Sequence, residues 1–262
     1  MRRGFDEANA PGAGLAIRAD PRTPSIAMYA STLPSTLLSA RGLACERGER
    51  CLFDHLDIDL RAGELLWVRG RNGRGKTSLL RLLAGVATPA AGEVRRAARG
   101  LSFVGHADAL KDDLSVAEAL AFLLRIHGHA GDARTVDGAL AHWGLVERRD
   151  APVRTLSPGL RRRVALARLS VHPSAAIWIL DEPFETLDAD GAERLNAQLA
   201  RQLAVGGSVL LTGHAPRLAA GLAMRTLDLD EHPAPELLAD GTFEPDRLVL
   251  RPAGRKLQLH GS

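Results

Sequence analysis

One stretch of the sequence limits the possible folds more than any other, the letters GRNGRGKT at positions 70–77. They fit the pattern G-x4-G-K-[ST] of a phosphate-binding loop, follow the short apolar segment 65–69 and open a helix-like segment at 76–84. Glycines let backbone N–H groups approach phosphates closely, and a helix start adds a positive partial charge. The alternative is a chance glycine-rich turn. In this context the pattern predicts an α/β domain with a phosphate site.

A second motif supports that interpretation. The apolar segment IWIL at 177–180 runs into Asp181 and Glu182, and ligands of parallel sheets bind where the strands end. We predict that Lys76 reaches the β- and γ-phosphates of ATP, while Thr77 and Asp181 hold Mg²⁺. Glu182 is then placed to orient or deprotonate the attacking water. The structural alternative is an acidic pair that only ends a surface strand.

The elements expected around these motifs alternate between strand and helix, as in an α/β sheet. Residues 106–156 contain helical pattern and no convincing strand, which predicts an inserted helical subdomain. The expected strands are 65–69, 101–105, 177–180 and 209–212, and the expected helices are 76–84, 116–126, 135–143, 160–170 and 190–203. Residues 247–250 and 256–259 form a possible hairpin.

Composition narrows the class of protein. The 262 residues include 34 Lys or Arg against 31 Asp or Glu, so the net charge of +3 is no nucleic-acid signature by itself. The two cysteines, Cys45 and Cys51, have no zinc-like spacing to other ligands. No apolar run reaches the length of a membrane helix, and the N-terminal residues lack a hydrophobic secretion segment. We therefore expect a cytoplasmic location.

A third motif, LSPGL at 156–160, has the chemistry of an anion site at a helix start. Ser157 suits the N-cap, Pro158 suits the first helical position, and Gly159 exposes its amide. The four arginines at 161, 162, 163 and 168 follow on the same helix. They suggest either a nucleic-acid surface or a face that is solvated or contacts another subunit, and we favour the second.

These three motifs, in this order, resemble those of ABC ATPases, and LSPGL is similar to their L-S-G-G-Q signature. The resemblance implies a P-loop ABC-type nucleotide-binding domain that works as a homodimer, in which the signature covers the γ-phosphate bound to the other chain. It also implies that residues 186–188 contact the partner, that His214 is the switch histidine beside the γ-phosphate, and that His106 stands in place of the glutamine that senses Mg²⁺. Leu160 departs from the usual glutamine of the signature. Arg47 stands where most relatives place an aromatic residue against adenine, so its guanidinium plane is our candidate for stacking.

The expected site therefore combines residues from the motifs and from the resemblance. Catalytic roles are expected for Glu182, His214 and Lys76, and metal binding for Thr77, Asp181 and His106. The residues expected to bind nucleotide are Gly70, Arg71, Asn72, Gly73, Arg74, Gly75, Lys76, Thr77, Ser78, Asp181, Ser157 and Gly159. His127 and His129 invite a haem-ligand or metal-ligand interpretation, but we favour solvated loop histidines without partners.

Scattered matches at 43–50, 105–106, 162–169 and 178–184 narrow the resemblance to the ATP-binding subunits of bacterial cytochrome c maturation systems, also called haem exporters. That implies integral membrane partners, no nucleic acid, and a peripheral place on the cytoplasmic face of the inner membrane. ATP hydrolysis there drives haem export or the release of a haem-loaded chaperone. Two alternatives stay open: an ABC subunit for another substrate, and a soluble ABC protein acting on ribosomes or DNA. The expected boundaries are a disordered extension at 1–35, the nucleotide-binding domain at 36–228 with its helical subdomain at about 106–168, and a tail at 229–262.

Overall fold

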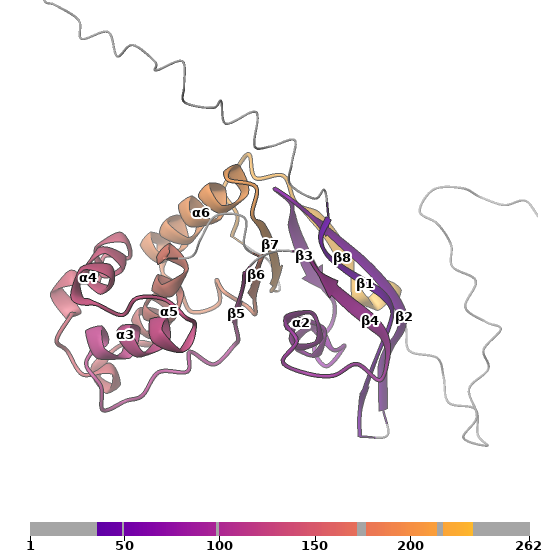
Figure 1. The fold of residues 1–262 in the computed structure, drawn as a ribbon, viewed down its shortest axis with the longest axis horizontal. Coiled ribbons are helices and arrows are strands. Elements are labelled where there is room, and N and C mark those ends of the chain that lie inside the picture. Colours follow the sequence, from indigo (N-terminus) through magenta and orange to yellow (C-terminus); the bar gives the residue numbers. More distant parts are fainter. Residues whose placement is uncertain (1–35, 49, 98–99, 172–176, 214–216, 233–262) are drawn as a thin grey trace, which may run out of the picture. The chain divides into compact units, whose positions relative to one another are not determined.

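The computed structural model describes residues 36–48, 50–97, 100–171, 177–213 and 217–232, which all lie in one compact unit. A five-stranded parallel sheet has the strand order β5-β6-β7-β3-β8, and a three-stranded antiparallel sheet has the order β2-β1-β4 (Figure 1). The strands are β1 Thr36–Arg47, β2 Arg50–Arg61, β3 Leu65–Arg69, β4 Ala91–Arg96, β5 Leu101–Val104, β6 Ile177–Leu180, β7 Ser208–Thr212 and β8 Arg225–Asp228.

Helices connect the strands of the parallel sheet. The α-helices are α2 Lys76–Ala84, α3 Val116–Ile126, α4 Ala133–His142, α5 Pro158–Ala167 and α6 Ala189–Ala204. Short 3-10 helices are η1 Val146–Arg148, η2 Val153–Thr155, η3 Arg168–Val171 and η4 Leu229–Glu231. Figure 1 shows α3, α4 and α5 as neighbours, and no strand forms between residues 106 and 156. The helical insertion predicted from the sequence is therefore present.

Side chains of the parallel sheet alternate between two apolar clusters. On β6, Trp178 and Leu180 pack with α3, α4, α5 and α6, whereas Ile177 and Ile179 pack with the antiparallel sheet and α2. Strands that are buried on both faces are typical of parallel sheets covered on both sides. This burial fixes β6, and with it the position of the acidic pair that follows.

Four strands were not predicted, namely β1, β2, β4 and β8. The pairing of β1 with β2 has several register shifts, and each shift interrupts the period-two pattern that identifies a strand. β4 is exposed along almost its whole length, so it has no apolar pattern. In β2, however, Leu56, Ile58 and Leu60 are buried and alternate with aspartates. That alternation is the period-two pattern of a strand, so β2 could have been predicted from the sequence.

The remaining expectations differ from the structure mainly at their ends. The helix expected at 160–170 begins at Pro158 and gives way to a 3-10 turn after Ala167, and the helix expected at 135–143 spans 133–142. Leu229 is fully buried, so ordered structure continues beyond the boundary expected at 228. The extension at 1–35 and the hairpin at 247–259 lie outside the described residues.

Candidate nucleotide site

The phosphate loop joins the end of β3 to the start of α2, as the sequence pattern requires. Gly75 has a φ of 98°, in the left-handed region that favours glycine, and a Cβ placed there would lie 3.2 Å from the Cβ of Leu52. No side chain caps the start of α2 among the described residues. The amides of its first turn, including those of Thr77 and Ser78, therefore remain available to an anion.

Lys76 lies across this loop. Its side chain is largely buried, with 7% of the residue exposed, and Nζ donates to the carbonyl oxygens of Gly70 at 2.7 Å and Arg71 at 3.3 Å. The ammonium group is thus held by neutral acceptors of the same loop. An anionic phosphate is a stronger acceptor for such a cation than a carbonyl oxygen.

A cavity of about 550 Å³ brings the loop together with the acidic end of β6. This volume is ordinary for a small-ligand site. Its lining comprises Arg47, Arg50, Leu52, Asn72, Gly73, Gly75, Lys76, Thr77, Ser78, Glu182 and Glu185. Arg47, the candidate for stacking on adenine, therefore lines the same cavity as the loop, and Arg50 is a second cation in the lining that sequence reasoning missed.

Thr212, at the end of β7, organises the two acidic residues that follow β6. Its hydroxyl donates to Oδ1 of Asp181 at 2.7 Å and accepts from the backbone N–H of Glu182 at 3.0 Å. Asp181 is 1% exposed, and its Oδ2 has no hydrogen-bond partner among the described residues. A buried carboxylate oxygen without a partner is costly, and a cation would satisfy it.

Glu182 has a φ of 49°, which is rare for a residue that is not glycine. Its carboxylate lies 3.2 Å from Nδ1 of His106, and Glu185 lies 3.5 Å from the same nitrogen. Ligand atoms of these three residues all fall within 4.8 Å of one another, close enough to hold a metal ion. The structure therefore brings His106 to Glu182 and Glu185, and Glu185 was not predicted.

The start of α5 is built as the sequence predicts. Ser157 is the N-cap and accepts from the amide of Leu160 at 3.3 Å, and Pro158 occupies the first helical position. A Cβ on Gly159 would meet the carbonyl oxygen of Thr186 at 2.7 Å, so only glycine fits there. Neither Ser157 nor Gly159 lines the cavity around Lys76.

The expectation for the arginines after this motif is wrong for three of them. Arg162, Arg163 and Arg168 are 3%, 5% and 8% exposed, so they form neither a solvated face nor a surface for nucleic acid. They bond within the domain because helix α5 and the 3-10 turn η3, which begins at Arg168, are covered by other elements. Burial, reinforced by the charge of Arg162, lowers the pKa of Arg168 to about 10.

Each buried arginine binds a different part of the domain. Arg162 donates to the carbonyl oxygens of Gly105 at 2.8 Å and Asp181 at 2.6 Å, and pairs with Asp108 at 3.1 Å. Arg163 pairs with Asp188, and with Asp190 at 2.6 Å. Through Arg162, Gly105 and Asp181 are therefore bonded directly to α5, the helix that begins within the LSPGL motif.

Two histidine expectations remain. His127 is not a free loop residue: it ends α3, its Nδ1 lies 2.8 Å from the carbonyl oxygen of Leu123, and its Nε2 lies 3.1 Å from Arg168. Burial lowers the pKa of His127. His129 also has an interaction partner. His214 lies outside the described residues.

Known proteins resemble this chain in sequence. A model of the ABC transporter family matches residues 53–185. The cytochrome c biogenesis ATP-binding export protein CcmA of Pseudomonas syringae pv. tomato is 48% identical over 204 residues, which cover 73% of this chain and 94% of that protein. The protein of the same name from Salmonella typhi is 45% identical over 204 residues, covering 74% and 97%.

Solved structures show the same fold. An ABC transporter ATP-binding protein from Pyrococcus furiosus superposes with a TM-score of 0.63 at 21% identity, covering 75% of this chain and 99% of that one. A metal-chelate type ABC transporter in an inward-facing conformation gives a TM-score of 0.62 at 25% identity, covering 74% and 80%. Within the residues that the structure describes, no helix is both long enough and apolar enough to cross a membrane.

Proposed function

This chain belongs to the ABC transporter family, and within it to the CcmA proteins; on that premise we propose that it is the ATP-hydrolysing subunit of a membrane complex for cytochrome c biogenesis. The observation that carries the proposal is the shared cavity, in which a phosphate loop with its lysine faces Glu182. A phosphate-binding loop without an activating carboxylate would only bind a nucleotide, whereas the pair can bind and hydrolyse it.

The residues present fit ATP with Mg²⁺. Lys76 exchanges carbonyl oxygens for the β- and γ-phosphates, and the amides at the start of α2 hold the phosphates from the other side. Thr77 offers a hydroxyl, and Asp181 offers its Oδ2, which has no partner in the described part of the chain and which a cation would satisfy. The bound ion supplies compensation for the charge that develops on the phosphates.

Glu182 then acts on the water. Its carboxylate lines the cavity, with 22% of the side chain exposed. It therefore reaches solvent while Thr212 fixes its backbone. It accepts the water proton, or orients the water, as attack on the γ-phosphate begins. His106 holds Glu182 from one side, and the family resemblance assigns His214 to the γ-phosphate. Ser157 and Gly159 complete the equivalent site of a second chain.

We infer the partners of this chain from the name that its relatives share. Their name, cytochrome c biogenesis ATP-binding export protein, supports a complex with integral membrane subunits at the cytoplasmic face of the inner membrane. Hydrolysis there drives haem export or the release of a haem-loaded chaperone. An ATPase subunit for a different transported species is the second candidate, because nothing in the nucleotide site depends on the cargo.

The test separates these two candidates. Lys76→Ala removes the cation that binds the phosphates, so it should abolish ATP hydrolysis by the purified chain. It should also abolish haem-stained c-type cytochromes in cells without the wild-type gene. Arg95→Ala, on the exposed strand β4, is the matched control and should preserve both. Lost hydrolysis with normal cytochrome levels would indicate another cargo, and unchanged hydrolysis would contradict the site.

A further inference from the structure

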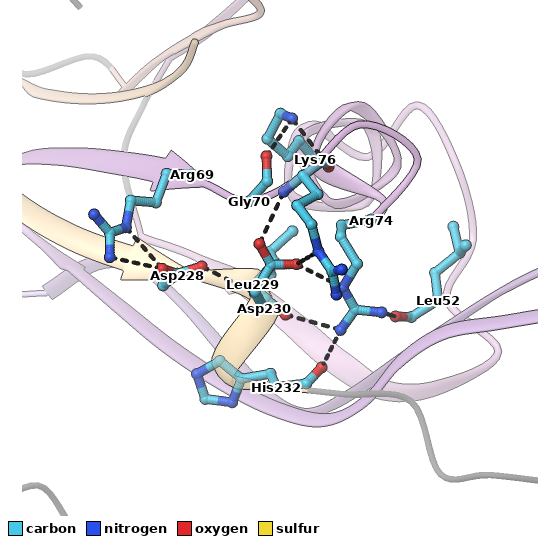
Figure 2. Close-up of polar contacts among 10 residues, drawn as sticks. Leu52, Arg69, Gly70, Arg74, Lys76, Asp228, Leu229, Asp230 and His232 are labelled. Carbon is cyan, nitrogen blue, oxygen red and sulfur yellow. Dashed lines mark hydrogen bonds and ion pairs between the residues drawn. The ribbon is translucent and has the colours of Figure 1, made fainter. Parts of the chain in front are cut away.

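The segment after β8 lies against the phosphate loop, although the two are far apart in the sequence (Figure 2). Leu229 is fully buried, and a Cβ placed on Gly70 would lie 3.3 Å from its Cβ. Asp228 anchors the segment, because it binds Arg69 at 2.7 Å and accepts from the backbone N–H of Asp230 at 2.9 Å. Asp230 is thereby held at the first residues of the loop.

Asp230 fixes one peptide plane of that loop. Its Oδ2 accepts from the backbone N–H of Arg71 at 2.9 Å. In a trans peptide the N–H and the preceding C=O point in opposite directions. The C=O of this peptide group belongs to Gly70, and its oxygen accepts from Nζ of Lys76 at 2.7 Å. Asp230 and Lys76 therefore bind the two sides of the same peptide group (Figure 2).

Arg74 fixes the loop at a second point. Its guanidinium donates to the carbonyl oxygens of Leu229 at 2.9 Å, His232 at 3.0 Å and Leu52 at 3.3 Å. Its Nε lies 3.2 Å from Oδ1 of Asp230. A side chain bound to three carbonyls is not available to the phosphates, so Arg74 serves as an anchor of the loop.

The charges favour this arrangement. Arg71, Arg74 and Lys76 place three cations within six residues of the loop, and Asp230 is the acidic residue that pairs with the two arginines. Partial burial alone raises the pKa of Asp230, but the hydrogen bond from the Arg71 amide and the charges of both arginines outweigh it and lower that pKa. The carboxylate is thus ionised at neutral pH.

We propose that Asp230 is a positioning residue for ATP, which orients the Gly70–Arg71 peptide and immobilises Arg74 so that the loop is preorganised before nucleotide binds. The inference rests on the proposed nucleotide site and deepens it. Preorganisation lowers the entropic cost of binding, so losing Asp230 acts on affinity. Asp181 and Glu182 are outside these contacts, and Lys76 has its own bonds to the loop carbonyls, so we expect the chemical step to be spared.

The experiment compares Asp230→Ala and Asp230→Asn with wild type, using the full chain, Mg²⁺ and the non-hydrolysable nucleotide AMP-PNP in a calorimetric titration. The Kd should rise about tenfold in Asp230→Ala, the scale of one lost charge-assisted hydrogen bond, and less in Asp230→Asn, which keeps an acceptor oxygen. The KM for ATP should rise in parallel while kcat stays within about twofold. Asp59→Asn, which removes a surface ion pair with Arg41, is the matched control and should leave Kd unchanged.

A Kd within about twofold of wild type in both Asp230 variants would overturn the inference, and so would a fall in kcat at constant KM. If Asp230→Ala does not fold, the nearly isosteric Asp230→Asn decides alone, with thermal unfolding of the free protein as the check on structure. Wild-type protein that binds no AMP-PNP at all would instead contradict the proposed function. Failure of the two proposals is therefore distinguishable.

Discussion

The hydroxyl of Thr212 forms hydrogen bonds with two acidic residues that we expect to have different roles. It donates to Asp181, whose remaining oxygen is buried and has no partner among the described residues, and accepts from the amide of Glu182, whose backbone is in the left-handed region. Left-handed backbone persists away from glycine only where the surroundings enforce it, and such residues concentrate at functional sites. The two adjacent acidic residues are therefore placed differently, because Asp181 is buried whereas Glu182 lines the cavity.

Glu182→Gln tests the second of these tasks. The amide keeps the shape of the side chain but accepts no proton, so hydrolysis should fall by roughly 10²-fold or more. Binding of ATP should persist, and the variant should accumulate as an ATP-bound dimer, measured by nucleotide retention on size-exclusion chromatography. Glu193→Gln, an exposed position on α6, is the control. Turnover equal to wild type in Glu182→Gln would remove this residue from the mechanism.

Helix α5 illustrates what the sequence reveals about an element and what it hides. Its start was predictable, because Ser157 and Pro158 act through local backbone geometry that any helix start shares. The burial of Arg162 and Arg163 was not predictable, because it depends on partners distant in sequence: Asp108 for the first, Asp188 and Asp190 for the second.

The same distinction explains the rest of the site. Lys76, Thr77 and Asp181 belong to contiguous motifs, so the sequence alone made them candidates. Thr212 and Asp230 act through contacts across the sheet, for which a single sequence gives no pattern. The strands β1 and β4 were missed for a related reason, since one has an interrupted alternation and the other lacks an apolar face.

A double substitution tests the pairing of Arg163 with the start of α6. Asp188→Asn with Asp190→Asn leaves a buried guanidinium without a carboxylate. Removing one side of a fully buried pair costs about 3–5 kcal/mol. We expect roughly 2 kcal/mol of unfolding free energy here, because both carboxylates are more than half exposed to screening by solvent. Chemical denaturation at pH 7 measures it, and Asp137→Asn, in the exposed pair with Arg149, should cost less than about 1 kcal/mol.

The same pairing has a defined pH dependence. The hydrogen bond from Arg163 lowers the pKa of Asp188, and hydrogen bonds from Arg194 and Arg163 lower that of Asp190. Each carboxylate therefore contributes its full stabilisation at pH values above its unfolded pKa of about 4. It loses that stabilisation as the pH falls through its lower pKa in the folded protein. The stability difference between wild type and the double variant should shrink over that acid range. A constant difference would show that the carboxylate charges are not responsible.

At the scale of the whole molecule, we propose that the nucleotide site in one chain is incomplete. Ser157 and Gly159 lie at the start of α5, yet they do not line the cavity that contains Lys76 and Glu182. The family resemblance places this motif against the nucleotide of a second chain. Each ATP then requires Lys76 from one chain and Ser157 from the other.

Mixing two inactive variants tests this requirement. A dimer of Lys76→Ala with Ser157→Arg has one site with both lesions and one with neither, so it should retain one ATP where neither parent retains any. Hydrolysis should recover to at most about half of wild type if one intact site can act alone. Thr155→Arg, which adds the same charge at an exposed position just before the helix, is the control. Ser157→Arg dimers that retain ATP like wild type would contradict the shared site.

Arg162 gives such a dimer a route for cooperativity. Its guanidinium joins the loop after β5 at Gly105 to the end of β6 at Asp181, and its own helix starts at Ser157. Because the Arg162 side chain is only 4% exposed and bonds to the ends of both strands, the start of α5 cannot shift far without moving Asp181 or breaking a buried hydrogen bond. We therefore expect ATP of a partner chain that binds at Ser157 to change the position of Asp181, the proposed magnesium ligand of this chain. ATP hydrolysis at the two sites of the dimer would then be coupled, with Arg162 in each chain linking Ser157 to Asp181.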